Sequence, residues 1–196
     1  MSAQDLEGIV RGRAITELAA VVERLAEPDR VRFDRLFHVS ESTGVLVAPA
    51  SMHKWIESFF GSVEAVEQQK IVKTTNVVTF EGTLFNALRS SRPMAADVPE
   101  QLDEIVGSNA GDPICHPHEG TPEDLFGRVN GAHAITASNI AKYDAFHGVV
   151  VYRQHNPLEF TRAAIVDYLD VGLRWGYEAL EADPEAKYYF FMWNCL

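Results

Sequence analysis

Residues 145–156 read AFHGVVVYRQHN, and this stretch decides the fold class that the sequence predicts. Three consecutive valines form a β-branched run typical of a buried strand, and a glycine before the run and an Asn-Pro pair after it bound the strand. The sequence therefore predicts a strand over 147–153. His147 and His155 flank it, either as solvated ends or as groups that a rigid element carries to the edge of a site.

The segments on both sides of this strand indicate an antiparallel arrangement. Residues 132–138, AHAITAS, have strand character and are joined to 147–153 by a loop of about eight residues. A parallel return needs a longer crossover, so the two strands are expected to pair antiparallel. Apolar residues at near-helical spacing predict a long helix over 160–180, and the aromatic stretch 187–196 predicts a further strand. This order favours an α+β fold.

The first half of the chain reads as mostly helical. Apolar residues at steps of three and four predict a helix over 6–25 that Pro28 ends. A second helix is expected over 51–69, a strand over 70–82 and a short helix over 83–93. The buried stripe expected for the second helix consists of Trp55, Ile56, Phe59 and Phe60. The sequence thus divides into a helical and mixed N-terminal extension, residues 1–110, and an antiparallel unit, residues 111–196.

Composition narrows the class of function. The 196 residues carry a net charge of −11, which argues against non-specific nucleic-acid or anionic-membrane partners, since these would select a basic surface. The two cysteines, Cys115 and Cys195, imply no disulfide framework and favour a reducing compartment. The first residues lack the apolar core of a signal peptide, and no stretch reaches membrane-spanning length. A cytoplasmic protein is expected.

A cysteine and a histidine in residues 114–118, ICHPH, have the spacing of one half of a zinc site. Thiolate and imidazole are both suitable zinc ligands. The other histidines that could complete such a site are His133, His147 and His155, and none of them is paired in sequence. The alternative is a buried cysteine and a loop histidine without metal.

Other polar residues also admit two interpretations. Asn139 follows a predicted strand, where an asparagine often supports a turn. Asn194 lies in the aromatic stretch YYFFMWNCL, where a buried amide must either bond to backbone or face a polar ligand. Arg89 and Arg92 could hold a phosphate or lie solvated on the surface.

Several of these segments together resemble a known family. Residues 137–160, ASNIAKYDAFHGVVVYRQHNPLEF, are followed by a long helix and then by YYFFMWNCL at 188–196. This order resembles the histidine-triad (HIT-like) superfamily, and within it the galactose-1-phosphate uridylyltransferase and ATP adenylyltransferase branch. The resemblance covers about residues 114–196. It implies a HIT-like antiparallel sheet with a long packing helix, so that residues 111–196 form a HIT-like half-domain.

The resemblance also implies roles for individual residues. It places Cys115, His118 and His155 as zinc ligands, although His118 stands where the family usually has a cysteine. Asn139 matches the residue that contacts the base or ribose of a nucleotide, and Asn194 matches the one that supports the phosphates. His147 is then expected to shape the turn between the two strands.

The family's catalytic signature, His-x-His-x-Gln, does not occur in these residues, so the resemblance assigns no catalytic residue to this chain. Its second histidine is the nucleophile that forms a covalent nucleotidyl intermediate. The sequence therefore resembles a truncated nucleotidyltransferase or phosphorylase for a nucleotide sugar or dinucleoside polyphosphate, inactive as it stands. The alternative is a non-catalytic nucleotide- or partner-binding domain. Because an unpaired apolar strand over 187–196 would seek a partner, a homo-oligomer or association with a missing C-terminal segment is expected.

Overall fold

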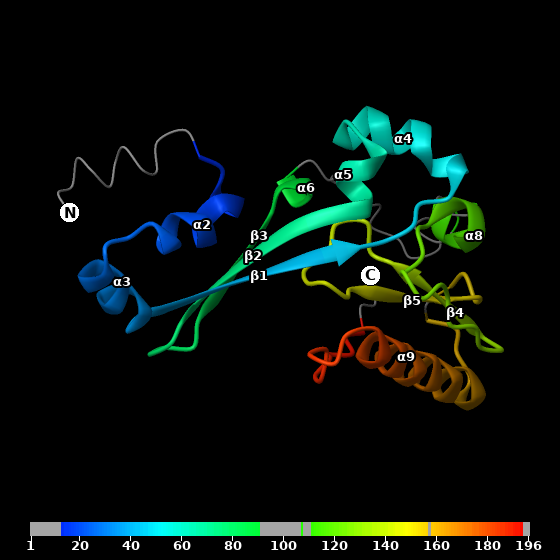
Figure 1. The fold of residues 1–196 in the computed structure, drawn as a ribbon. Coiled ribbons are helices and arrows are strands. Elements are labelled where there is room, and N and C mark those ends of the chain that lie inside the picture. Colours follow the sequence, from blue (N-terminus) through cyan, green and yellow to red (C-terminus); the bar gives the residue numbers. More distant parts are fainter. Residues whose placement is uncertain (1–12, 91–106, 108–110, 157, 194–196) are drawn as a thin grey trace.

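The computed structural model describes residues 13–90, 107, 111–156 and 158–193. The chain forms two antiparallel sheets, and α9 packs on the smaller one (Figure 1). The larger sheet has the strand order β1-β2-β3, with bounds Phe37–Val45, Gln68–Asn76 and Gly82–Asn86. The smaller sheet pairs β4 (Ala134–Ser138) with β5 (Gly148–Tyr152). The predicted α+β class is confirmed.

The β4–β5 pair confirms the predicted antiparallel strands, and α9 confirms the helix that apolar spacing predicted. The strands are antiparallel, with Ala134 opposite Tyr152. The helix α9 (Arg162–Ala182) begins where the Thr161 side chain accepts a hydrogen bond from Ala164 N (3.1 Å), an N-cap that satisfies a backbone donor left free at the helix start. Within the described ranges, no helix combines the length and apolar character needed to cross a bilayer.

The larger sheet lies in the region that the sequence suggested was mostly helical. The strand expected over 70–82 is present as β2, but residues 82–86 form β3 rather than the start of a short helix. The helix α6 covers only Ala87–Ser90. The short apolar pair Leu84 and Phe85 suits a strand as well as a helix, and pairing with β2 decides between them.

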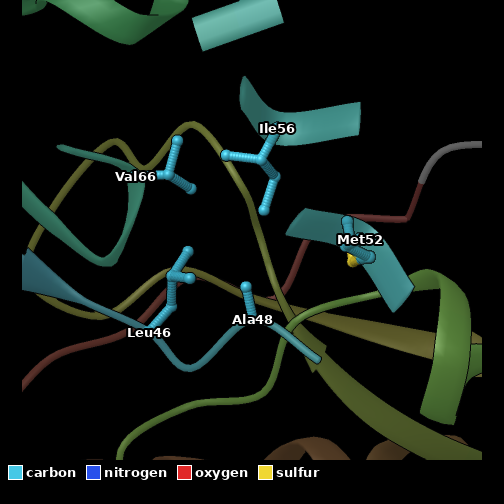
Figure 2. Close-up of a cluster of buried hydrophobic side chains, with 5 residues drawn as sticks. All are labelled: Leu46, Ala48, Met52, Ile56 and Val66. Atoms are coloured by element: carbon cyan, nitrogen blue, oxygen red, sulfur yellow. The ribbon is translucent and has the colours of Figure 1, made fainter. Parts of the chain in front are cut away.

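The helix expected over 51–69 is interrupted. It consists of α4 (Ala50–Phe60) and α5 (Val63–Glu67), because Gly61 has φ 89°, a left-handed conformation that ends a helix. The buried stripe was also predicted wrongly in part. The side chains that fill the core at this point are Leu46, Ala48, Met52, Ile56 and Val66 (Figure 2).

Trp55 and Phe59 lie outside that core. Their side chains are 39% and 46% exposed, and the two rings pack on each other with centroids 5.1 Å apart. Met52 and Ile56, four residues apart, form the face of α4 that is turned inward. The helix carries two apolar faces, and the sequence pattern alone favoured the aromatic one.

The N-terminal helices also differ from the prediction. In the described part, η1 (Ile15–Glu17) leads into α2 (Leu18–Glu23), and α3 spans Glu27–Asp34. Pro28 lies in the first turn of α3, where a proline is tolerated because its missing N–H would have no helical partner. It therefore begins a helix instead of ending one. The part of the predicted helix before residue 13 lies outside the described residues.

The strand expected over 187–196 is absent from its described part, residues 187–193. Phe191 and Tyr189 instead lie on α9 where its glycines leave room. A Cβ built on Gly172 would lie 2.5 Å from the Phe191 ring, and one built on Gly176 would lie 2.8 Å from the Tyr189 ring. Packing on the helix replaces strand pairing in this segment.

Candidate functional site

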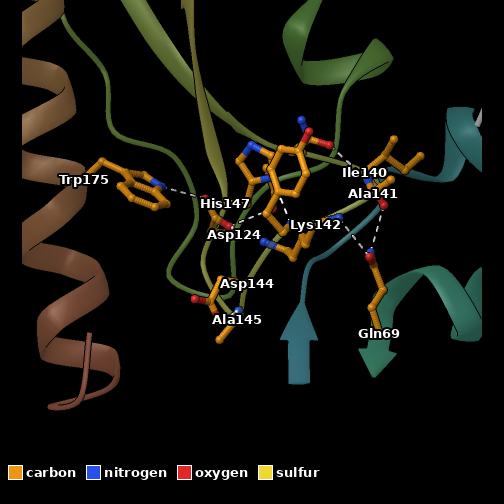
Figure 3. A network of polar contacts seen from close by, with 12 residues as sticks. Gln69, Asp124, Ile140, Ala141, Lys142, Asp144, Ala145, His147 and Trp175 are labelled. Carbon is orange, nitrogen blue, oxygen red and sulfur yellow. Dashed lines mark hydrogen bonds and ion pairs between the residues drawn. The ribbon is translucent and has the colours of Figure 1, made fainter. Parts of the chain in front are cut away.

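A buried ion pair holds the loop between β4 and β5. Lys142 Nζ lies 3.0 Å from Asp124 Oδ1, and the two side chains are 0% and 1% exposed (Figure 3). Asp124 also accepts hydrogen bonds from Ser138 Oγ and from Trp175 Nε1 of α9, both at 2.7 Å. Burial lowers the pKa of Lys142, and the Asp124 carboxylate opposes that shift. Both charges are thus paired and hydrogen-bonded, as buried charges need to be.

The backbone of the same loop is held by the larger sheet. Gln69 Oε1 accepts from Lys142 N (3.0 Å), and Gln69 Nε2 donates to Ile140 O (2.8 Å). Asn86 Nδ2 donates to Lys142 O (2.9 Å). The loop 139–147 is therefore fixed from both sheets, and any group that it carries has a defined position.

His147 and Tyr143 form the end of this loop. Tyr143 N donates to His147 Nδ1 (3.1 Å), and the two rings stack with centroids 4.8 Å apart. Burial, together with the nearby charges of Lys142 and Arg89, lowers the pKa of His147 to about 4. The ring is therefore neutral at pH 7, with its proton on Nε2. These contacts agree with the expected role of His147 in shaping the turn.

Arg89 is engaged by the same loop. Its guanidinium lies over the Tyr143 ring, 3.8 Å from the centroid, and donates to Tyr143 Oη (2.8 Å) and Ala141 O (2.9 Å). This arrangement is neither of the two that the sequence suggested, a phosphate ligand or a solvated arginine. Arg92 lies outside the described residues.

Asn139 lies at the entry of the loop, half-buried. Its Oδ1 accepts from Ala141 N (3.0 Å), and its backbone N donates to His147 O (2.8 Å). The side-chain oxygen thus supports the turn, as asparagine often does. Asn194, the other residue expected to contact a nucleotide, lies outside the described residues.

Two of the three expected zinc ligands lie together. Cys115 Sγ is 3.2 Å from His155 Nδ1, although forty residues separate them in the chain. Cys115 ends η2 (Pro113–Cys115), where Asp112 Oδ1 accepts from Cys115 N (3.1 Å), and His155 follows β5. Cys115 is exposed and forms no disulfide.

The third expected ligand, His118, is exposed on α8 (Pro117–Gly120). No set of three or more histidine, cysteine or acidic side chains is gathered for a metal among the residues that the structure describes. A zinc site needs at least three protein ligands and usually four. Thiolate and imidazole are donors that suit zinc, but Cys115 and His155 alone are fewer than a zinc site needs.

A cavity of about 440 Å³ lies beside α9, but it contains none of the predicted site residues. Two arginines line it, and both are engaged. Arg128 donates to Thr121 and to Thr136 O, and Arg174 donates to Asp170 Oδ2 and to Asn130 O. Little positive charge remains for an anionic ligand.

Sequence reasoning missed the residues that fix the site. Nothing in the sequence singled out Lys142 or Asp124, which are eighteen positions apart and look like ordinary surface charges. The one available signal was the apolar setting of Lys142 in NIAKYDAF.

Comparisons of the chain with protein-family models, with curated proteins and with solved structures gave no match.

Proposed function

We propose that this chain is the nucleotide-binding part of a HIT-like nucleotidyltransferase or phosphorylase of the galactose-1-phosphate uridylyltransferase and ATP adenylyltransferase type. Its substrate would be a nucleotide sugar or a dinucleoside polyphosphate. One observation carries the proposal: Cys115 and His155, far apart in sequence, lie 3.2 Å apart. The resemblance implies a common role, as zinc ligands, for these two residues.

In this proposal Asn139 contacts the base or ribose through its amide NH₂. The Asn139 oxygen is used by Ala141 N, and within the described part of the chain Nδ2 makes no hydrogen bond. The rigid loop between the two sheets would hold that donor in place, which reduces the entropy lost on binding. Asn194 would support the phosphates.

Zinc in this proposal is held by Cys115 and His155, with His118 as the third ligand. A zinc ion bound there would stabilise the loops around it, because binding to folded ligands adds to folding free energy. His118 must approach the other two for the set to be complete. The metal has no assigned step in the chemistry.

The proposal predicts binding without turnover. The residues of this chain contain no His-x-His-x-Gln sequence, so no group is present to form the covalent nucleotidyl-histidine. Incubation with radiolabelled ATP or UDP-glucose should leave the protein unlabelled. Labelling of His116, His118 or His155 would contradict the proposed family role.

The short distance between Cys115 and His155 also favours a second candidate, a non-catalytic nucleotide- or partner-binding domain. The two candidates differ when a polypeptide carrying the catalytic signature is supplied. Labelling that appears only with the added polypeptide supports the transferase, and binding that never leads to labelling supports the binding domain.

Nucleotide binding can be tested with Asn139→Asp. This change keeps the oxygen that accepts from Ala141 N and removes the NH₂ donor, so the turn should survive while affinity for UDP-glucose or diadenosine tetraphosphate falls at least tenfold, as measured by calorimetry. Asn76→Asp is the matched control, because Asn76 is also half-buried, its Oδ1 also supports a turn by accepting from Val78 N (2.9 Å), and its NH₂ makes no hydrogen bond within the described residues. An equal loss in both variants would reflect the added charge and would contradict the role of Asn139.

Zinc binding can be tested by elemental analysis of protein purified without chelator. We expect up to one zinc per chain, with partial occupancy, and a strong reduction in both Cys115→Ser and His155→Ala. His133→Ala is the control, since His133 is an exposed histidine outside the proposed set. Zinc content that is unchanged in the first two variants would exclude the assignment.

A further inference from the structure

The turn between β2 and β3 presents apolar side chains to solvent. Phe80 is 82% exposed and Val78 is 63% exposed, and residues 77–80 carry no charge. The turn lies beside α3, at the end of the larger sheet opposite α4 (Figure 1). An exposed aromatic side chain at a turn is expensive to keep in water unless another surface covers it.

The backbone of Phe80 is strained. Its φ of 61° lies in the left-handed region, which costs a bulky residue about 1–2 kcal/mol relative to its preferred conformations. Asn76 holds the turn in this shape. Its O accepts from Phe80 N (2.8 Å), and its Oδ1 accepts from Val78 N (2.9 Å) and Thr79 N (3.2 Å). A strained residue that a network of hydrogen bonds fixes in place is a candidate for function.

A cavity of about 350 Å³ lies next to this turn. The apolar half of its lining comes from the N-terminal helices, with Ile15 and Leu18, and from the sheet, with Phe37 and Phe85. The other lining residues are polar or charged: Thr74, Asn76, Glu81 and Thr83. An apolar cavity of about 150 Å³ is enough to hold a benzene ring. This cavity can therefore accept a phenylalanine side chain, and the chain's own Phe80 does not line it.

We propose that two copies of this chain associate about a two-fold axis, with Phe80 of each copy inserted in this cavity of the other. Such a contact requires the projecting group and its receiving cavity to lie on one patch of the same molecule. That requirement is met, because Asn76 and Glu81 belong both to the cavity lining and to the hydrogen bonds that close the Phe80 turn. The interface is independent of the proposed nucleotide site.

The size of the patch sets the strength of the dimer. Two inserted phenylalanines bury roughly 300–500 Å², whereas a standard stable interface buries at least about 1,200 Å² in total. Val77 and Val78 of the same turn are also exposed, as is Leu36, whose O accepts from Val77 N (2.9 Å), and these side chains would enlarge the contact. The dimer is thus small and concentration-dependent. Because each chain carries a charge of −11, added salt strengthens it by screening the repulsion.

The test is sedimentation equilibrium of the wild-type chain and three variants, with thermal melting to verify folding. We expect a reversible dimer for the wild type. Phe80→Asn should be monomeric with an unchanged or higher melting temperature, because asparagine tolerates φ 61° better than phenylalanine does. Thr83→Arg, which keeps Phe80 but places a long charged side chain at the cavity, should also be monomeric.

Phe190→Asn is the control for a general loss of apolar surface. Phe190 is 94% exposed and lies on the C-terminal segment, away from the cavity lining, so this variant should dimerise like the wild type. Dissociation in Phe190→Asn would place the contact on residues 187–193 and overturn the proposal. A dimer that persists in Phe80→Asn, or a wild-type chain that stays monomeric at high concentration and high salt, would overturn it as well.

Discussion

Two threonines, one on each sheet, show that a buried hydroxyl can either lower or raise the free energy of unfolding, depending on whether it has a hydrogen-bond partner. Thr74 Oγ1 on β2 is buried and has no hydrogen-bond partner within the described residues. Thr136 Oγ1 on β4 accepts from Val129 N (2.8 Å) and lies in a residue that is 1% exposed. An unpartnered buried hydroxyl costs free energy, whereas removal of a partnered one leaves its donor unsatisfied.

We therefore expect Thr74→Val to raise the free energy of unfolding by about 1 kcal/mol, since valine has a similar shape and suits a strand. Thr136→Val should lower it by about 1–3 kcal/mol. Denaturant unfolding of both variants provides the measurement. Losses of equal size would show that the Thr74 hydroxyl has a partner in solution.

At the scale of elements, the loop 139–147 should make stability depend on pH through His147. The pKa of His147 is about 4 in the folded chain, below its usual value of 6.5, because the ring is partly buried beside Lys142 and Arg89. The unfolded chain therefore binds a proton that the folded chain rejects as the pH falls from 6.5 to 4. The contribution of His147 to the free energy of unfolding is fully present above about pH 6.5 and is lost as the pH falls toward 4.

His147→Asn isolates this effect, because an amide oxygen can still accept from Tyr143 N but cannot titrate in this range. Between neutral pH and pH 4 the wild type should lose on the order of 1–2 kcal/mol more than the variant, a value reduced for the partial exposure of the ring. Urea unfolding at several pH values measures the difference. If the free energy of unfolding depended on pH in the same way for both proteins, the lowered pKa of His147 would be contradicted.

The sequence correctly predicted the elements that a local pattern of apolar residues specifies. The valine run and the short loop before it fixed β4, β5 and their antiparallel pairing, and the 3.6-residue period marked α9. The errors arose where tertiary contacts decide. Residues 83–85 join β2, and residues 187–193 pack on the glycines of α9 instead of forming a strand.

The candidate site shows the same division. The spacing around Cys115 and the position of His155 after a strand could be read from the sequence, but only the fold shows that Cys115 and His155 lie 3.2 Å apart. The partners of Lys142 could not be predicted, because they come from a distant loop, from β2 and from β3. Neither composition nor periodicity encodes such long-range pairing.

Across the whole molecule, Lys142 is one of the points where the larger sheet is joined to the β4–β5 unit. Its amine pairs with Asp124, which also binds Trp175 of α9, and its backbone is held by Gln69 and Asn86 of the larger sheet (Figure 3). A Cβ on Gly44 of β1 would lie 2.7 Å from Lys142 Cδ, so the strand passes close to the lysine stem. Loss of the Lys142 side chain should therefore destabilise both the larger sheet and the β4–β5 unit.

Lys142→Met keeps the length of the stem but leaves Asp124 buried without its counter-charge. We expect a loss of about 3–5 kcal/mol, a large share of the stability of an ordinary domain, measured by denaturant unfolding with hydrogen exchange to follow both sheets. Lys142→Met combined with Asp124→Asn should recover part of it, because no buried charge then remains. Lys70→Met is the matched control. Its exposed pair with Glu41 (2.7 Å) should contribute less than about 1 kcal/mol, and an equal cost for both lysines would show that the buried pair does not hold the sheets together.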